Sequence, residues 1–225
     1  MDTTFPHLSP GASRSFKKQL LALFAPLAIT VAALYSPCVV AQSNDLDAIK
    51  TSYSEESKGR YGQAASVLEP LLRRTPDSAF LLARLGWLSY LQGKHNDAIG
   101  KYSQALAVRP QAHDIRLGLS LPLMAQQRWQ EAADEVNKVI DVSPWNYNAH
   151  IKLLICEQGL RQWKQMEQHA MSFSQRYPLD PSAWVYLARS LAWQGKKEAA
   201  KKAYWQVLEI SPTHAEAVSY LNKNP

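Results

Sequence analysis

Residues 79–112, AFLLARLGWLSYLQGKHNDAIGKYSQALAVRPQA, contain the features that organise this chain. The proline near the end of this stretch recurs at a fixed spacing of 34 residues, at Pro76, Pro110, Pro144, Pro178 and Pro212. A fixed period of this length is the sequence signature of a repeat architecture, in which each repeat is one supersecondary unit. The sequence therefore predicts five stacked copies of one unit.

Other positions keep the same period. Leucine stands twenty-five residues before four of the five prolines, and Thr51 takes that place in the first copy. A position twelve residues before each proline is small in four copies and holds a methionine in the fourth: Ala64, Ala98, Ala132, Met166 and Ala200. Small residues let two helices approach closely, so the larger Met166 predicts a wider helix pair in the fourth copy.

Each copy has the length of two antiparallel helices of about 12–14 residues. Helices this short are marginal alone in water, and stacking against neighbouring copies is what buries their apolar faces. We expect Gly59, Gly93 and Gly195 at the turn between the two helices of their copies. Asp180 is expected to cap a helix that begins at Pro181, because proline suits a first helical position.

These positions resemble the tetratricopeptide repeat family. The second copy matches best, and the likeness covers residues 45–214. The resemblance implies an all-α fold, a right-handed α-solenoid of five tetratricopeptide repeats within residues 42–214, with a short C-terminal capping helix in residues 215–225. The repeats are expected at 45–78, 79–112, 113–146, 147–180 and 181–214.

Residues 1–41 have the pattern of an export signal. Lys17 and Lys18 precede an apolar stretch from Leu20 to Tyr35, and small residues precede a cleavage point after Ala41. Three interpretations remain open: a cleaved secretory signal, an uncleaved anchor over residues 19–41, and a lipoprotein signal at Cys38. We expect an exported protein, periplasmic or secreted, alternatively anchored to the inner membrane by this segment, which is the only membrane contact expected.

Composition and motifs argue against several functions. The formal net charge is +6, too small and too dispersed for a nucleic-acid surface. No phosphate loop, dinucleotide fingerprint or metal-ligand spacing is present, so we expect no cofactor, no metal site and no catalytic residues. Cys156 is predicted to be a small buried apolar residue. The repeats also leave no room for a second, catalytic domain, and the sequence predicts a protein that is not an enzyme.

The resemblance places the first helix of each repeat on a concave surface. Ile49, Phe80 and Val185 belong to the stripe that this predicts, which is apolar and aromatic and is edged by cations. Aromatic and arginine residues are typical of interaction hot spots. The predicted partner-binding groove consists of Tyr53, Arg84, Trp87, Tyr90, Leu117, Leu121, Met124, Asn148, Ile151, Lys152, Ile155, Tyr186 and Arg189.

The function that these observations favour is a non-catalytic adaptor. It would bind a peptide or an amphipathic helix of another protein in the groove, in assembly of a cell-envelope or secretion complex. Basic edges would favour acidic residues on that ligand. Two alternatives stay open: a structural homo-oligomer formed by end-to-end stacking of solenoids through their terminal faces, and a glycan-binding or enzyme accessory module. For the stripe itself, packing against neighbouring helices or a second copy is the alternative to a binding groove.

Overall fold

The computed structural model describes residues 36–224, and the chain divides into two compact units, residues 1–50 and 51–225. Helix α2, Ser36–Ser57, contains the described part of the first unit, where Lys50 Nζ lies 3.7 Å from Asp47 Oδ1. The apolar stretch of the predicted export signal lies outside the described residues. Within residues 36–224, no helix has both the length and the apolar character needed to span a membrane.

The second unit consists of helical hairpins, and residues 36–224 contain no strand. The first helix of each successive hairpin begins 34 residues after the previous one: α5 Ala79–Leu91, α7 His113–Ala125, α9 Tyr147–Gly159 and α11 Pro181–Trp193. The second helices keep the same interval: α6 His95–Val108, α8 Trp129–Val142, α10 Trp163–Arg176 and α12 Lys197–Ile210. The short helix α13, Ala215–Lys223, follows the last hairpin.

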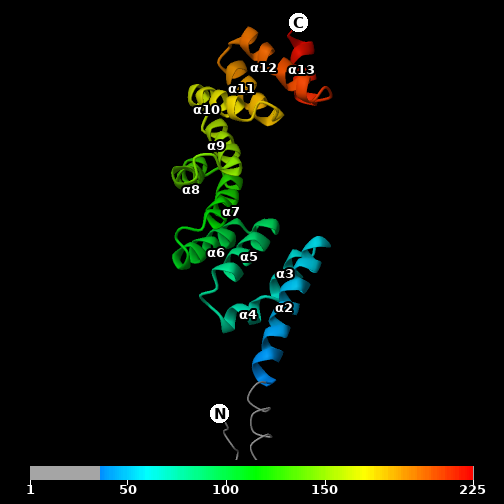
Figure 1. The fold of residues 1–225 in the computed structure, drawn as a ribbon, viewed down its shortest axis with the longest axis vertical. Helices are drawn as coiled ribbons and strands as arrows, with labels where there is room; N and C mark the ends of the chain where they lie inside the picture. Colours follow the sequence, from blue (N-terminus) through cyan, green and yellow to red (C-terminus); the bar gives the residue numbers. More distant parts are fainter. Residues whose placement is uncertain (1–35, 225) are drawn as a thin grey trace, which may run out of the picture. The chain divides into compact units, whose positions relative to one another are not determined.

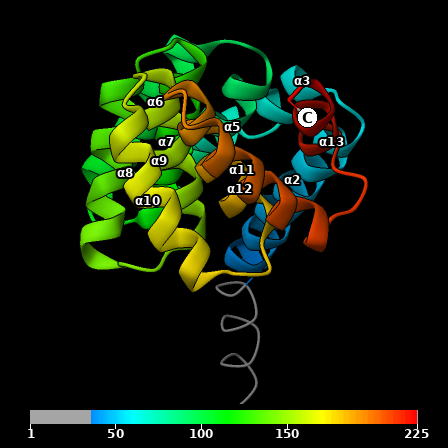
Figure 2. The same ribbon diagram turned by 90° about the horizontal axis from the view of Figure 1, so that it is seen from above.

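Consecutive hairpins pack against each other along the chain, as Figure 1 shows from α5 to α13. Helices α8 and α10 lie on the outer side of this stack, and α7 and α9 lie on its inner side (Figure 2). The predicted all-α solenoid with a C-terminal capping helix is therefore confirmed.

The second helix of the first repeat is interrupted, which the repeat pattern did not predict. It forms two short pieces, α3 Tyr61–Ser66 and α4 Glu69–Arg74. Pro70 explains the break, because proline has no N–H to donate and its ring clashes with the carbonyl one turn earlier. The interruption leaves an open hollow of about 780 Å³ beside α6, which Leu72, Arg73 and Lys101 help to line.

In three of the first helices, the side chain at the fourth position forms a hydrogen bond to the turn that precedes the helix. Arg116 Nη2 donates to the carbonyl of Pro110 at 2.6 Å, and Trp184 Nε1 donates to that of Pro178 at 2.9 Å. His150 Nε2 lies 2.8 Å from the carbonyl of Pro144. The periodic proline therefore ends one repeat and presents its carbonyl as an acceptor for the next.

Helix caps follow the sequence where a capping side chain is present. Asp180 Oδ1 accepts a hydrogen bond from Ser182 N at 2.9 Å, and α11 begins at Pro181 as predicted. Asn146 caps α9 in the same way, with its Oδ1 3.0 Å from Ala149 N. These side chains satisfy N–H groups that have no partner within the helix.

The turn inside each hairpin requires one residue in the left-handed region. Gly59, Gly93 and Gly195 occupy it with φ of 73°, 73° and 74°. At the equivalent places in the third and fourth repeats, Gln127 and Arg161 adopt φ of 58° and 57°. Residues other than glycine are strained in this region, so the repeat geometry imposes a conformation that these two side chains disfavour.

We expect Gln127→Gly to raise the free energy of unfolding by about 0.5–1 kcal/mol, because the relief of left-handed strain exceeds glycine's loss of chain entropy. The reverse change, Gly93→Gln, should lower it by a similar amount. Urea unfolding followed by circular dichroism measures both. Effects of the same sign for the two changes would contradict the account, because the turn would then not favour glycine at this position.

The core confirms two further predictions. Met166 is buried, and α9 and α10 approach each other less closely than the helices of the neighbouring hairpins do. Cys156 is fully buried, and burial raises the pKa of its thiol to about 12. Pro122 lies inside α7, which continues past it to Ala125, and this proline has no N–H to donate to the carbonyl of residue 118.

Candidate functional site

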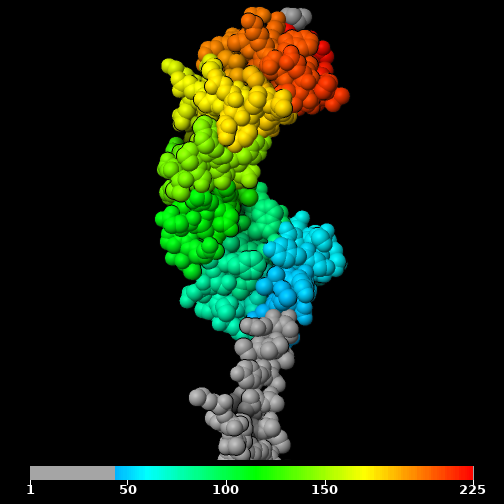
Figure 3. Space-filling model, viewed as in Figure 1, coloured from blue at the N-terminus to red at the C-terminus, as the bar shows by residue number. Residues whose placement is uncertain are grey.

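The inner side of the stack is hollowed. In Figure 3 the surface over the middle hairpins is recessed between the two ends of the 51–225 unit. The first helices α7 and α9 face this inner side, as expected for the predicted groove.

The predicted groove residues differ widely in exposure. Tyr53 and Asn148 are exposed, whereas Arg84 and Met124 are buried, so the expected exposure of the last two is wrong. Val185, at the edge of the predicted stripe, is buried as well. The others are half-buried: Trp87, Tyr90, Leu117, Leu121, Ile151, Lys152, Ile155, Tyr186 and Arg189.

Several half-buried members also belong to the apolar core. Trp87, Leu121 and Ile155 pack against the cluster that contains the buried Met124. Ile151 and Tyr186 pack against a second cluster toward the C-terminus. These side chains of the stripe therefore have two roles. Part of each packs between neighbouring first helices, and part of each remains exposed on the inner surface.

Arg84 joins the first two repeats and is not a free basic group. Its side chain is 8% exposed, and its guanidinium pairs with Glu56 and lies with Cζ 3.9 Å from the ring centroid of Tyr53. Trp87 Nε1 donates to the same carboxylate at 2.6 Å. Although burial opposes ionisation, the hydrogen bonds from Arg84 and Trp87 hold the pKa of Glu56 below its usual value.

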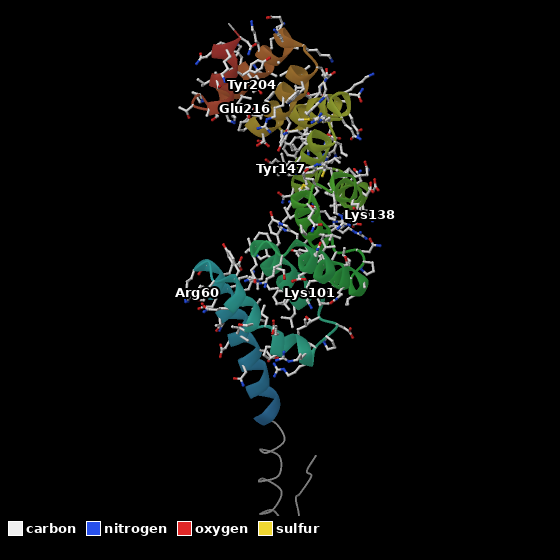
Figure 4. The ribbon with its side chains drawn as sticks, turned by 180° about the vertical axis from the view of Figure 1, so that it is seen from behind. Arg60, Lys101, Lys138, Tyr147, Tyr204 and Glu216 are labelled. Atoms are coloured by element: carbon white, nitrogen blue, oxygen red, sulfur yellow. The ribbon has the colours of Figure 1, made fainter. Side chains whose placement is uncertain are left out.

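Arg189 forms the corresponding tie at the other end of the unit. It donates through Nε and Nη2 to the two oxygens of Glu216 at 2.8 and 2.6 Å. Tyr204 donates to Glu216 at 2.8 Å, and Figure 4 labels both residues on neighbouring helices α12 and α13. The hydrogen bond from Arg189 is the main reason that the pKa of Glu216 is lowered.

Lys152 differs from every other lysine or arginine of the first helices α5, α7, α9 and α11. Each helix carries one such cation, and three are paired: Arg84 with Glu56, Arg116 with Glu135, and Arg189 with Glu216. Within residues 36–224, no carboxylate lies within ion-pair distance of Lys152, and burial lowers the pKa of its amine. The middle of the inner surface therefore holds a partly desolvated cation without a counter-charge.

A buried polar chain, which sequence reasoning missed, connects α9 and α10. His150 Nδ1 lies 2.7 Å from His169 Nε2, and His169 Nδ1 lies 3.0 Å from Glu157 Oε2. Glu157 is 2% exposed. Burial lowers the pKa of His150, which favours its neutral form.

A count of the protons shows that all hydrogen bonds of the His150–His169–Glu157 series can form in one net charge state. The carbonyl of Pro144 can only accept, so His150 Nε2 donates to it and the neutral His150 accepts at Nδ1 from His169 Nε2. One further proton must then lie between His169 Nδ1 and Glu157. Whichever of the two carries it, the cluster is neutral overall and each of its three contacts is a hydrogen bond.

The positions of these residues within the repeat could have indicated the hydrogen bond between His150 and His169. His150 and His169 occupy the fourth and twenty-third places of the fourth repeat. Arg116 and Glu135 occupy those places in the third repeat and form an ion pair at 2.6 Å. The two pairs are therefore the same contact made with different chemistry. Treating each histidine as a lone residue concealed it, because the partners are nineteen residues apart and meet only across the hairpin.

This inner surface combines ion pairs with apolar side chains. Within residues 36–224, no group of three or more histidine, cysteine or carboxylate side chains is arranged to hold a metal ion. Paired arginines brace its ends, apolar side chains line its middle, and one uncompensated amine lies among them. Such a surface can accept an apolar segment that carries a negative charge.

The fold and this inner surface define a helical-repeat solenoid of the protein-binding class. Models of the tetratricopeptide repeat match residues 52–103, 85–146 and 182–214, which together are more than half of the chain. The chain belongs to the tetratricopeptide repeat family, whose members generally act as non-catalytic scaffolds for protein–protein interaction.

Solved structures share this fold at low sequence identity. MamA from Desulfovibrio magneticus RS-1, residues 41 to the end, superposes with a TM-score of 0.70 at 14% identity, covering 76% of this chain and 97% of that one. YrrB, described as a tetratricopeptide repeat protein with an unusual peptide-binding site, gives 0.68 at 13% identity, with 82% and 96% covered. A thermophilic repeat protein of Thermus thermophilus gives 0.58 at 18% identity, with 79% and 97% covered. None of the curated proteins matches the sequence.

Proposed function

We propose that this protein is a non-catalytic adaptor that binds an apolar segment of a partner protein on its inner surface, with an acidic group of that segment paired to Lys152. The observation that carries the proposal is the contrast among the first-helix cations. Arginines at both ends of the surface have carboxylate partners within the chain, whereas Lys152 has none among the described residues.

The energetics favour a carboxylate over other groups at this place. A half-buried ammonium loses hydration, and in these surroundings a single opposite charge interacts more strongly than it does in water. Ile151 and Ile155 on the same helix as Lys152, and Leu121 on α7, are half-buried and offer apolar area to the residues that neighbour that charge in the segment. An extended or helical segment with one acidic residue between apolar residues complements this arrangement.

The peptide-binding site named for YrrB supports this proposal by likeness of fold. From the export pattern of residues 1–41 we further propose that the adaptor works in the cell envelope, where it would help to assemble a larger complex. Mass determination of the protein recovered from cell fractions tests that placement, since cleavage after Ala41 predicts a defined loss of mass.

Binding of selected peptides to the full chain tests the groove. Random twelve-residue peptides displayed on phage are selected against the protein, and synthetic copies are titrated by fluorescence polarisation. We expect selected sequences to carry Asp or Glu between apolar residues. Lys152→Glu should weaken their binding by about 2 kcal/mol or more, roughly thirtyfold, and binding should return when the peptide's acid is replaced by lysine.

Lys101→Glu is the matched control, because Lys101 is also half-buried but lies on the second helix α6, where it lines the hollow of about 780 Å³ beside the interrupted helix (Figure 4). It should leave peptide affinity unchanged. Selected peptides without acidic residues, or equal effects of the two variants, would overturn the assignment of Lys152. A concentration-dependent dimer that blocks peptide binding would favour the homo-oligomer instead.

A further inference from the structure

A pair of tryptophans at the turn end of the last two hairpins is not explained by the groove. Trp163 begins α10 and Trp193 ends α11, and their rings stack with centroids 5.2 Å apart and planes 6° from parallel. Trp193 is 68% exposed. An indole this exposed contributes little to the core, although it is the largest apolar side chain available.

The neighbouring repeat shows that the fold does not need Trp193. Trp129 and Gly159 take the same two places one repeat earlier. A Cβ atom on Gly159 would lie 2.4 Å from Cδ2 of Trp129, so that ring packs directly against the α9 backbone. The fourth repeat thus folds with a glycine at this position, whereas the last repeat has Trp193 there, with its side chain extending from the turn.

Three adjoining hollows meet at this pair. The central one, of about 280 Å³, is lined by Gln158, Arg161, Trp163 and Trp193. A second, of about 560 Å³, shares Gln158 and Trp193 and continues toward α13. A third, of about 680 Å³, shares Arg161 and Trp163 and continues along α10. Together they give an elongated ligand a continuous path across the two rings.

The free polar groups of the central hollow are hydrogen-bond donors. Gln158 Oε1 accepts from Arg189 Nη1 at 3.3 Å, which leaves the Gln158 amide NH₂ to face a ligand. Arg161 has only donors, and within residues 36–224 it has no ion pair. Among the hydrogen bonds of residues 36–224, none involves the indole N–H of Trp163 or Trp193. Among the described residues that line the three hollows, the only carboxylate is that of Glu216, which is occupied by Arg189 and Tyr204.

The aromatic floor is held in place before any ligand binds. Gln194 Nε2 donates to the carbonyl of Trp163 at 3.1 Å and also lies 2.7 Å from Glu167 Oε2. Lys196 pairs with the same carboxylate at 2.6 Å. Such bracing between the two turns reduces the ordering cost of binding, because the rings need not be immobilised by the ligand.

We propose that this site binds a proline-rich segment of a partner protein in the polyproline II conformation. Proline has no N–H, so such a segment presents carbonyl acceptors only, which complements a lining of donors. Its pyrrolidine rings pack flat against indole faces, and its conformation exists before binding, as in other aromatic-lined sites for proline-rich peptides. A saccharide fits less well, because the central hollow offers few acceptors to its hydroxyl hydrogens: no carboxylate lines it, and Gln158 Oε1 already accepts from Arg189.

Calorimetric titration of the full chain with N-acetylated decaproline tests this site. We expect saturable binding, weakened about tenfold or more by Trp193→Ala, as for an aromatic hot spot. Trp205→Ala is the matched control, since Trp205 is 57% exposed on α12 and lines none of the three hollows. It should leave the affinity unchanged, and both variants should keep the wild-type melting temperature.

Two results would overturn the proposal. One is the absence of decaproline binding, and the other is an equal loss in the two variants. Chitohexaose and cellohexaose are titrated in parallel, and binding of either that depends on Trp193 would assign the site to a saccharide instead. Because Lys152 is not part of this site, Lys152→Glu should leave decaproline binding intact, which separates failure here from failure of the groove.

Discussion

Replacing His169 with leucine is expected to lower the free energy of unfolding by about 3–5 kcal/mol. The change removes the group that shares a proton with Glu157, whose carboxyl is 2% exposed and would be left without a charge partner. It also removes the donor to His150 Nδ1. Urea unfolding followed by circular dichroism at neutral pH measures the loss.

The control and the rescue separate this cause from a general effect on α10. Gln168→Leu changes an exposed neighbour on the same helix and should alter stability by no more than about 0.5 kcal/mol. Adding Glu157→Leu to the His169 variant should restore at least about half of the loss, because an apolar pair can replace a buried ionic one. If the double variant is no more stable than the single one, the unpaired carboxyl is not the cause.

Gly159→Ala is expected to lower the free energy of unfolding by about 2 kcal/mol. The new methyl group would lie 2.4 Å from Cδ2 and 2.6 Å from Cε2 of Trp129, so the ring must leave its place against α9. Helix propensity alone predicts the opposite sign, since alanine is the better helix former. Thermal and urea unfolding measure the change.

Gly100→Ala gives the matched comparison. Gly100 lies within α6, is exposed and has no atom within 4 Å of the position that a Cβ would take. Alanine there should stabilise the protein by about 0.5–1 kcal/mol. The Gly159 variant should also lose most of its penalty in a Trp129→Leu background. A stabilising Gly159→Ala change would show that the ring does not pack as described.

Much of the fold could be predicted because the residues that pack the helices of tetratricopeptide repeats recur in the sequence at a fixed spacing of 34 residues. The spacing of Pro110 and its equivalents predicts where each repeat ends, and Asp180 with Pro181 predicts where a helix begins. The interrupted α3–α4 segment was missed because the signal, Pro70, stands at a place where no other repeat has proline. Features that are common to all repeats do not predict a feature that one repeat alone has.

The site was less predictable, because the register identifies a helix face but not the partners of its side chains. Arg84 was expected to be an exposed cation and is buried against Glu56, which lies in the preceding repeat. Lys152 occupies the equivalent place in its own repeat and has no such carboxylate within the described residues. The difference depends on a residue twenty-eight positions away from Arg84, and sequence spacing alone does not join them.

The sequence by itself determined the period, the helical hairpins and the turn that glycine prefers, since these follow from interactions within one repeat and with its immediate copy. The tertiary structure decided which charges are neutralised, which aromatic rings stay exposed and which histidine side chains are hydrogen-bonded to each other. These outcomes depend on side chains that meet across hairpins. The free energies of these side-chain contacts are set by burial and by the neighbouring partner, and the spacing of residues in the sequence specifies neither.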